Sequence, residues 1–354
     1  MNEGTREPVV ASDLDYQERI LQGVSRTFAL TIPQLPGPLC RVVGNAYLLC
    51  RIADTIEDDP SLDGAQKRQF SEAFIRVIAG EQSAEDFAEA LRPLLSDAIL
   101  DAEKALIENT PRVIRLTHAF NARKRAALER CVRIMSRGMS DFQQNKTLDG
   151  LDDLAEMDRY CYCVAGVVGG MLTELFCDYS QEIDANRAEL QKLAVSFGQG
   201  LQMTNILKDV WEDRARGACW LPRDVFQRVG FDLGRLAVDH DRGRFTQGLE
   251  ELIGIARMHL QNALSYTLLI PGGEPGIRRF CLWALGMAVL TLRKIHANPG
   301  FVSGGQVKIS RRSVKAVVLA SNASVRSDTV LRLLFETFTR SLPVAERPPK
   351  PILV

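Results

Sequence analysis

Apolar residues recur at three- and four-residue intervals along almost the whole chain, whereas two-residue alternation bounded by turn residues is scarce. This spacing gathers apolar side chains on one face of a helix. The sequence therefore predicts an all-α protein with roughly ten helices. The breaks are expected at Pro33–Pro38, Asp59–Gly64, Asn109–Pro111, Asn145–Gly150, Tyr179–Asp184, Arg216–Pro222, Pro271–Gly276 and Asn298–Gly305.

The breaks between predicted helices are short, and none has the composition of a linker. We therefore expect one domain over residues 13–342, preceded by a flexible N-terminus over residues 1–12. Residues 343–354 are rich in proline and are expected to form a flexible tail. With 354 residues, of which 46% are hydrophobic, such a domain can surround a cavity with a sizeable core.

Charge and cysteine content exclude several classes of function. Lys+Arg and Asp+Glu both total 44, so no net field attracts nucleic acid, and we expect no nucleic-acid partner. The eight cysteines are scattered without a CxxC pair, which is typical of reduced core residues in a cytoplasmic protein. No signal peptide is visible. The apolar runs around Cys161–Leu172 and Cys281–Leu292 are shorter than the ~20 residues that span a bilayer, so no membrane anchor is expected.

An acidic pattern, Asp-x-x-Glu-Asp, ends the helical run from Leu39 to Asp59. At about 100° per residue, Glu57 and Asp58 lie on the same arc as Asp54. That arc also contains Val43, Tyr47, Cys50 and Arg51, and the opposite arc contains Leu48, Leu49, Ile52 and Ile56.

The pattern occurs a second time at the end of the run from Leu193 to Asp213, where Asp209, Glu212 and Asp213 share one arc. Gln202 and Asn205 lie on this arc as well. Met203, Leu207 and Trp211 lie on the opposite arc.

Carboxylates at these spacings repel one another, and at the C-terminal end of a helix the macrodipole also disfavours them. Magnesium would relieve both penalties, because it binds one or two carboxylates and completes its shell with water and phosphate oxygens. A solvated helix end is the alternative for one copy, and two copies make it less favoured. The predicted metal ligands are Asp54, Glu57, Asp58, Asp209, Glu212 and Asp213.

From about Ser25 to Arg312 the chain resembles the squalene and phytoene synthase family of head-to-head prenyl transferases. The resemblance is carried by four motifs whose order along the chain is highly specific. They are Ser25-Arg26-Thr27-Phe28, Tyr47-x-x-x-Arg51-x-x-Asp54-Thr55-Ile56-Glu57-Asp58, Tyr160-Cys161-Tyr162-Cys163-Val164-Ala165-Gly166 and Gln202-x-x-Asn205-Ile206-x-x-Asp209-x-x-Glu212-Asp213.

The resemblance implies an isoprenoid synthase fold, with a central helix-lined cavity in a single domain, and farnesyl diphosphate as substrate. Asp54, Asp58, Asp209 and Asp213 would then act in catalysis through magnesium. Lysine stands at position 208 where arginine is expected, and it supplies charge without a bidentate fork. The implied diphosphate-binding residues are Ser25, Arg26, Phe28, Tyr47, Arg51, Gln202, Asn205, Lys208 and Arg216. For Arg26 and Arg51, a salt bridge to nearby carboxylates is the alternative role, and both roles can coexist.

Tyr160 is implied as the group that takes or relays the proton lost when presqualene diphosphate closes. The released diphosphate can share this task, because a phenol is a weak base. A core tyrosine with a satisfied hydroxyl is the alternative. The glycines within Val164–Gly170 fit either an isoprenoid chain lying against the helix or tight helix packing.

The segment Asn298–Arg312 resembles the loop that marks the reducing, NADPH-using squalene synthases, with Asn298, Lys308 and Arg311 as implied cofactor contacts. Ser310 stands where arginine usually follows Val-Lys-Ile, and a solvated basic turn is the alternative. The expected cofactors are Mg²⁺ and NADPH, and the expected product is squalene. A dehydrosqualene or phytoene synthase, a presqualene diphosphate synthase and, more remotely, a non-catalytic helical assembly factor stay open. A cytoplasmic enzyme with transient contact at the inner membrane surface would suit so apolar a product.

Overall fold

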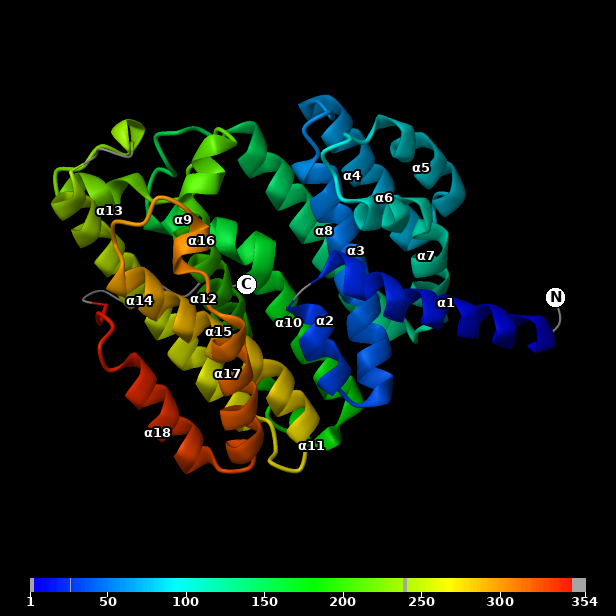
Figure 1. Cartoon of the computed structure of the whole chain (residues 1–354). Helices are drawn as coiled ribbons and strands as arrows, with labels where there is room; N and C mark the ends of the chain where they lie inside the picture. The colour runs from blue at the N-terminus through cyan, green and yellow to red at the C-terminus, as the bar shows by residue number, and fades with distance from the viewer. Residues whose placement is uncertain (1–2, 26, 238–240, 346–354) are drawn as a thin grey trace. The chain divides into compact units, whose positions relative to one another are not determined.

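A computed structural model describes residues 3–25, 27–237 and 241–345, with side chains from residue 11 onward. Apart from one isolated bridge between Leu151 and Pro222, the regular structure of these residues is helical, which confirms the all-α prediction (Figure 1). The chain divides into two compact units. Unit 1 comprises Met1–Gln144 and Met171–Ala185, and unit 2 comprises Asn145–Gly170 and Asn186–Val354.

Unit 1 is built around α3, which packs against α1, α4, α6, α7 and α8. The predicted apolar arc of α3 is confirmed, since Leu48, Leu49, Ile52 and Ile56 are completely buried. The helices of this unit are α1 (Glu3–Val24), α2 (Phe28–Thr31), α3 (Gly37–Asp58), α4 (Gly64–Ala79), α5 (Ala84–Leu91), α6 (Asp101–Glu108), α7 (Thr110–Ala119), α8 (Ala122–Gln144), α10 (Val167–Tyr179), whose first turn belongs to unit 2, and α11 (Gln181–Asp184).

Unit 2 is built around α12, which packs against α14, α15 and a π-helical turn over Tyr162–Gly166. Glycine is required where the backbones meet, because a Cβ atom on Gly169 or Gly198 would lie 2.1 or 2.2 Å from a carbonyl oxygen. The helices are α9 (Leu154–Cys161), α12 (Arg187–Ala215), α13 (Arg223–Arg228), α14 (Arg242–Leu269), α15 (Pro275–Ala297), α16 (Gly304–Val307), α17 (Arg311–Ser324) and α18 (Asp328–Thr339).

The described residues contain more helices than the roughly ten that were predicted. Breaks at Gly80 and at Ser327 separate helices that periodicity alone had joined. Helix α1 begins at Glu3, inside the segment predicted to be flexible. Most of the predicted tail, from residue 346, lies outside the described residues. The single domain over residues 13–342 and its central cavity stay predictions.

Two helical stretches, Leu154–Tyr179 and Pro275–Ala297, are long and apolar enough to cross a membrane by length and composition. The sequence analysis considered only the shorter apolar runs within them, and its expectation of no membrane anchor stays a prediction. Core helices of globular proteins meet the same criterion, because they too need an apolar surface. About half of each apolar window is buried within the structure, 44% and 50% respectively. All eight cysteines are free, as expected for a reduced protein.

Candidate active site

The first acidic motif occupies the last turn of α3. Asp54 keeps 28% of its side chain exposed and Asp58 is exposed, whereas Glu57 is buried at 3%. Glu57 is therefore the least accessible predicted ligand in this motif, and its role as a ligand stays a prediction. Two aspartates one helical turn apart remain open to a cation.

The neighbouring residue Asp59 is completely buried and has a structural role. Its carboxylate accepts hydrogen bonds from the backbone N–H groups of Ser61, at 2.7 Å, and Ser96, at 2.9 Å. Lys67 donates to the carbonyl oxygen of Glu57, where the negative end of the helix dipole favours a cation. The end of α3 is thus fixed by groups that leave Asp54 and Asp58 available.

Four of the residues predicted to bind diphosphate lie in one chain of contacts beside this motif. Ser25 Oγ accepts a hydrogen bond from the Phe28 backbone at 2.9 Å, and the Phe28 and Tyr47 ring centroids are 5.1 Å apart. The Tyr47 hydroxyl donates to the Val24 carbonyl and accepts from Arg51 Nη2, both at 3.0 Å. Arg26, in the middle of this motif, lies outside the described residues.

Arg51 forms the ion pair that was its alternative role. Its Nη1 lies 3.9 Å from Asp54 and 3.5 Å from Glu103, which α6 contributes. Burial raises the pKa of Asp54 to about 7; Arg51 opposes this rise, and the negative charges of Asp58 and Glu103 add to it. A nearby cation would therefore favour the ionised form of Asp54.

The second acidic motif occupies the last turns of α12. Asp209 is 37% exposed and pairs with Lys208 at 2.9 Å, while Asp213 is half-buried. Of the predicted diphosphate-binding residues in this unit, Gln202 is half-buried and Asn205 is exposed. Arg216 is exposed where the helix ends.

The predicted cofactor loop is fastened to this second motif. The Gly304 backbone N–H donates to Glu212 Oε1 at 2.8 Å, and Trp211 Nε1 donates to the Phe301 carbonyl at 2.7 Å. A Cβ atom on Gly304 would lie 3.0 Å from Asp209 Oδ1 and from the Lys208 carbonyl oxygen. Glycine therefore fits this approach with less crowding than any residue that carries a Cβ atom.

The rest of the loop leaves its polar residues at the surface. Lys294 donates to the Lys308 carbonyl at 2.7 Å, which holds the backbone while the Lys308 side chain is exposed. Asn298 and Arg311 are also exposed. The structure thus brings the Asn298–Arg311 segment next to the second motif, a proximity that sequence spacing alone could not indicate.

Tyr160 lies in the last turn of α9, and its ring stacks on that of Trp220 with centroids 4.4 Å apart and planes 8° apart. Sequence reasoning missed Trp220, because an isolated tryptophan in a loop carries no motif. Its segment is held by backbone bonds from Cys219 to the Thr147 carbonyl and from Leu151 to the Leu221 carbonyl, both 2.9 Å. The stack fixes the plane of the Tyr160 ring.

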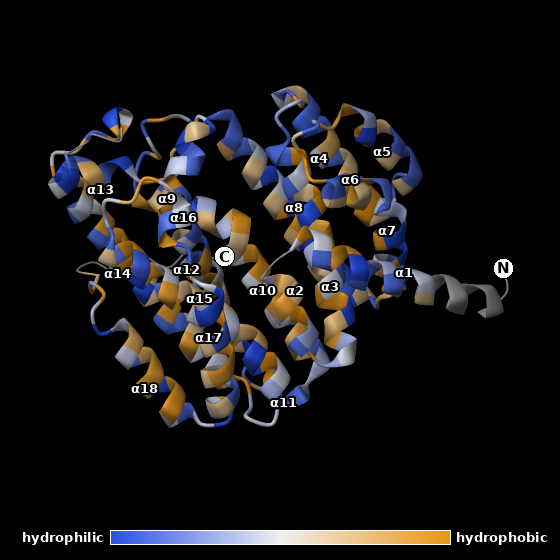
Figure 2. Cartoon of the chain, viewed as in Figure 1, coloured by the Kyte–Doolittle hydropathy of each residue, from blue (hydrophilic) through white to orange (hydrophobic). Residues whose placement is uncertain are grey.

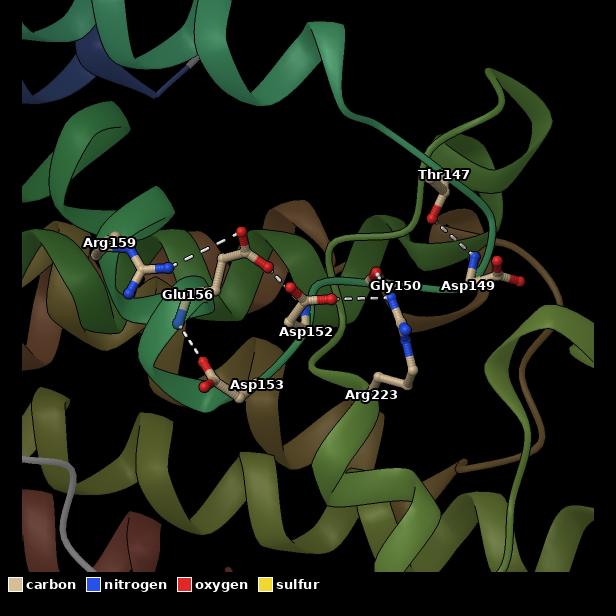
Figure 3. Close-up of polar contacts among 8 residues, drawn as sticks. All are labelled: Thr147, Asp149, Gly150, Asp152, Asp153, Glu156, Arg159 and Arg223. Carbon is tan, nitrogen blue, oxygen red and sulfur yellow. Dashed lines mark hydrogen bonds and ion pairs between the residues drawn. The ribbon is translucent and has the colours of Figure 1, made fainter.

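A polar network holds the start of α9 (Figure 3). Asp153 accepts from the Glu156 backbone at 2.7 Å, and Glu156 accepts from the Asp152 backbone at 2.6 Å. Arg223 ties Asp152 to this network through a contact of 3.1 Å. The Asp153 bond satisfies one of the first N–H groups of the helix, that of Glu156, and the network so fixes the turn that leads to Tyr160.

Asp158, two residues before Tyr160, is 5% exposed and was also missed. Burial raises its pKa to about 7, and Asp153 adds to the rise. Its Oδ1 atom has no hydrogen-bond partner among the described residues. The sequence signal that could have identified it is an acidic residue three positions before Cys161, on the same side of the helix.

The residues of both motifs fit a magnesium site. In the described part of the chain, no three Asp, Glu, His or Cys side chains converge as a preformed metal cage. Magnesium does not need one, since it is held by one or two carboxylates together with water and substrate phosphates. Asp54 with Asp58 and Asp209 with Asp213 supply such pairs in their own units.

Comparison with known proteins agrees with these motifs. A sequence model of the squalene/phytoene synthase family matches residues 21–313. The chain belongs to this family. Squalene synthase 1 of Arabidopsis thaliana is 30% identical over 305 residues, which cover 85% of this chain and 69% of that protein.

Two solved structures are similar in fold to this chain. The ligand complex of TcSQS has a TM-score of 0.74 at 24% identity and covers 93% of this chain and 91% of its own. A ligand-bound dehydrosqualene synthase has a TM-score of 0.65 at 21% identity, with 90% and 98% covered. The isoprenoid synthase fold predicted from the sequence is therefore confirmed.

Proposed function

We propose that this family member is a squalene synthase that requires Mg²⁺ and NADPH. It condenses two molecules of farnesyl diphosphate head to head through presqualene diphosphate and then reduces this intermediate to squalene. Family membership supports the prenyl transfer. The observation that carries the reductive assignment is the hydrogen bond between Glu212 and Gly304, which ties the predicted NADPH loop to an acidic motif.

In the proposed reaction, Arg51 and Tyr47 in unit 1 and Lys208 in unit 2 would contact substrate diphosphates. Each aspartate pair, Asp54 with Asp58 and Asp209 with Asp213, would hold magnesium in its own unit. Magnesium, when bound, supplies positive charge that stabilises the departing diphosphate. The preformed contact of Arg51 with Tyr47, at 3.0 Å, lowers the entropic cost of orienting the guanidinium. Glu57 and Glu212 are then supporting ligands, whose burial and loop contact restrict their motion.

Tyr160 takes or relays the proton that the substrate loses when presqualene diphosphate closes, and the released diphosphate shares this task as the final acceptor. Stacking on Trp220 restricts the ring to one plane, so its hydroxyl has a defined direction. Lys308 and Arg311 supply positive charge for the dinucleotide phosphates. No Gly-x-Gly-x-x-Gly occurs in the chain, so the nicotinamide cofactor is bound without a Rossmann motif.

The test is product analysis with the purified full chain, farnesyl diphosphate and magnesium, with and without NADPH. We expect squalene with NADPH, unreduced or hydroxylated products without it, and no diphosphate release after chelation. Lys308→Ala is expected to divert product in the same way while substrate consumption continues. Product that does not depend on NADPH would instead indicate a dehydrosqualene or phytoene synthase, and accumulation of presqualene diphosphate would indicate an enzyme that stops there.

We also propose a cytoplasmic location with transient contact at the inner membrane surface, where an apolar product leaves the enzyme. Fractionation of cells that express the full chain tests this location. An assembly factor without catalysis would release no diphosphate under any of the conditions above.

A further inference from the structure

The last two helices of unit 2 have outer faces that no other described element covers. Helices α17 and α18 both pack on α15, and they contact each other (Figure 1). The inner face of α17 is fixed by Val317, which occupies the space that a side chain on Gly286 would need, at 2.6 Å. Helix α18 buries Leu331 on its inner side. Their remaining faces are available to a partner.

These outer faces expose apolar side chains. Leu319 on α17 is 73% exposed, and Leu333 and Val330 on α18 are 61% and 42% exposed. Val330 and Leu333 are three residues apart, so they share one side of α18. Figure 2 shows hydrophobic residues along this helix. A cluster of this kind on a protein surface is typical of an interaction site.

The same two helices carry a positive charge that the whole chain does not have. Residues 311–340 contain six basic and two acidic residues, in a chain with 44 of each sign. One of the two acids, Asp328, is paired with Arg278 at 2.7 Å. Within the described residues, none of the six basic side chains has an acidic partner within 4.0 Å. They are Arg311, Arg312, Lys315, Arg326, Arg332 and Arg340, and all are exposed.

On α17 the two features coincide. Arg312, Lys315 and Leu319 follow one another at three- and four-residue spacing, which places two cations and the most exposed leucine on one face. Long basic side chains can reach lipid headgroups while a leucine between them enters the acyl boundary.

We propose that the outer faces of α17 and α18 form a docking surface for an anionic lipid bilayer. Charge complementarity selects anionic headgroups, since each Lys or Arg near such a surface contributes to attraction. The exposed leucines and valine favour a bilayer over a nucleic acid, which would match the charge but not these side chains. The proposed function enters this inference only as the reason for such a surface, which is the transfer of an apolar product into lipid.

The direct test is co-sedimentation of the full chain with vesicles of phosphatidylcholine alone or mixed with phosphatidylglycerol. We expect at least about tenfold stronger partitioning onto the anionic vesicles, because several cations contribute together. Added salt should weaken this binding, since it screens exposed charges. Equal partitioning onto both kinds of vesicle would contradict the proposal.

Two pairs of variants locate the surface. Arg312→Glu with Lys315→Glu should reduce partitioning at least about tenfold, whereas Arg125→Glu with Arg130→Glu, on exposed α8 positions, changes the net charge equally and should have little effect. Leu333→Glu should also weaken binding. Leu100→Glu is its control, since Leu100 is 60% exposed and lies in unit 1. Equal losses in test and control variants would overturn the assignment of the face.

Other partners give different outcomes. A second copy on this face would raise the mass by light scattering, in a way that Leu333→Glu abolishes, without vesicle binding. Binding to RNA that persists in Leu333→Glu, again without vesicle binding, would identify a nucleic-acid surface. Either result overturns the proposal. The sedimentation needs no substrate, so vesicle binding without prenyl products refutes only the proposed function, and squalene formation without vesicle binding refutes only the docking surface.

Discussion

The two Asp-x-x-Glu-Asp motifs have the same spacing and the same position at a helix end, yet their central glutamates differ. In unit 1, Glu57 is buried, and Asp54 pairs with Arg51, which also pairs with Glu103. In unit 2, Glu212 accepts a hydrogen bond from the backbone of a loop 92 residues further along the chain. Both copies of the pattern therefore supply a pair of solvent-accessible aspartates, and each copy also has a contact of its own.

This difference suggests a division of tasks. Arg51 joins the motif of unit 1 to a chain of contacts through Tyr47 and Phe28 to Ser25, which suits diphosphate binding. The motif of unit 2 carries the loop predicted to bind NADPH, which suits the reductive step. Four predictions test this comparison, from the largest expected effect to the smallest.

The shared function of the two motifs can be broken in either copy. Asp54→Asn and Asp209→Asn should each reduce diphosphate release at least about a hundredfold, because each removes a charged metal ligand where negative charge develops. Steady-state release at saturating magnesium measures this loss. Asp15→Asn, at an exposed position on α1, is the control. A variant that keeps normal turnover and its melting temperature would show that its motif holds no essential metal.

Tyr160 lies outside both motifs, so its substitution tests whether the motifs alone are enough to form presqualene diphosphate. Tyr160→Phe should slow formation of presqualene diphosphate by about tenfold or more, because it removes a proton-transfer group and keeps the ring. Stacking on Trp220 should survive, so magnesium and substrate affinities should change little. Rapid-quench measurement of the first half-reaction gives the rate. An unaltered rate would leave Tyr160 with only a structural role.

The loop contact is particular to the second motif, and Gly304→Ala tests it. The added methyl group would lie 3.0 Å from Asp209 Oδ1 and the Lys208 carbonyl oxygen, which is tighter than ordinary contact and disturbs the packing of the loop on the motif. We expect the KM for NADPH to rise about fivefold, with a smaller effect on presqualene diphosphate formation. Gly305→Ala is the matched control, since its nearest neighbour would be Ser303 Oγ at 3.7 Å. If both substitutions changed the KM for NADPH equally, the contact between the loop and the second motif would have no role in cofactor binding.

The smallest effect concerns Asp158, a buried acid of unit 2 outside the motif. Its folded-state pKa of about 7 exceeds the ordinary value of 3.8, so the folded protein binds a proton that the unfolded chain releases over this range. The free energy of unfolding should therefore fall as pH rises from about 4 to 7, by at most a few kcal/mol. Asp158→Asn should remove this part of the pH dependence. Urea unfolding at several pH values measures it, and identical slopes for wild type and variant would contradict the assignment.

Several features were predictable because they depend on local sequence. The helical spacing of apolar residues located α3 and α12, and the arc containing Leu48 and Ile56 proved to be the buried one. The position of both acidic motifs at helix ends followed from the same periodicity. Periodicity did not reveal that Trp211 donates a hydrogen bond to the Phe301 carbonyl. A half-buried tryptophan and a core tryptophan occupy the same position in a helical pattern of apolar residues.

The glycines of residues 164–170 show the same limit. Sequence allowed either substrate contact or helix packing, and the structure shows packing at Gly169, where a Cβ atom would meet the Ala194 carbonyl oxygen at 2.1 Å. Asp158 and Trp220 were missed because burial and ring stacking depend on segments far apart in the chain. No local pattern encodes such contacts.

The sequence by itself determined the helical class, the family resemblance and the residue types available for metal and diphosphate. These properties reside in residue order over one or a few helical turns. Only the tertiary structure decided that Glu57 is buried, that Glu212 holds Gly304, and that Tyr160 lies on Trp220. Each of these depends on how distant segments pack, because burial, hydrogen bonding and stacking are set by neighbours in space.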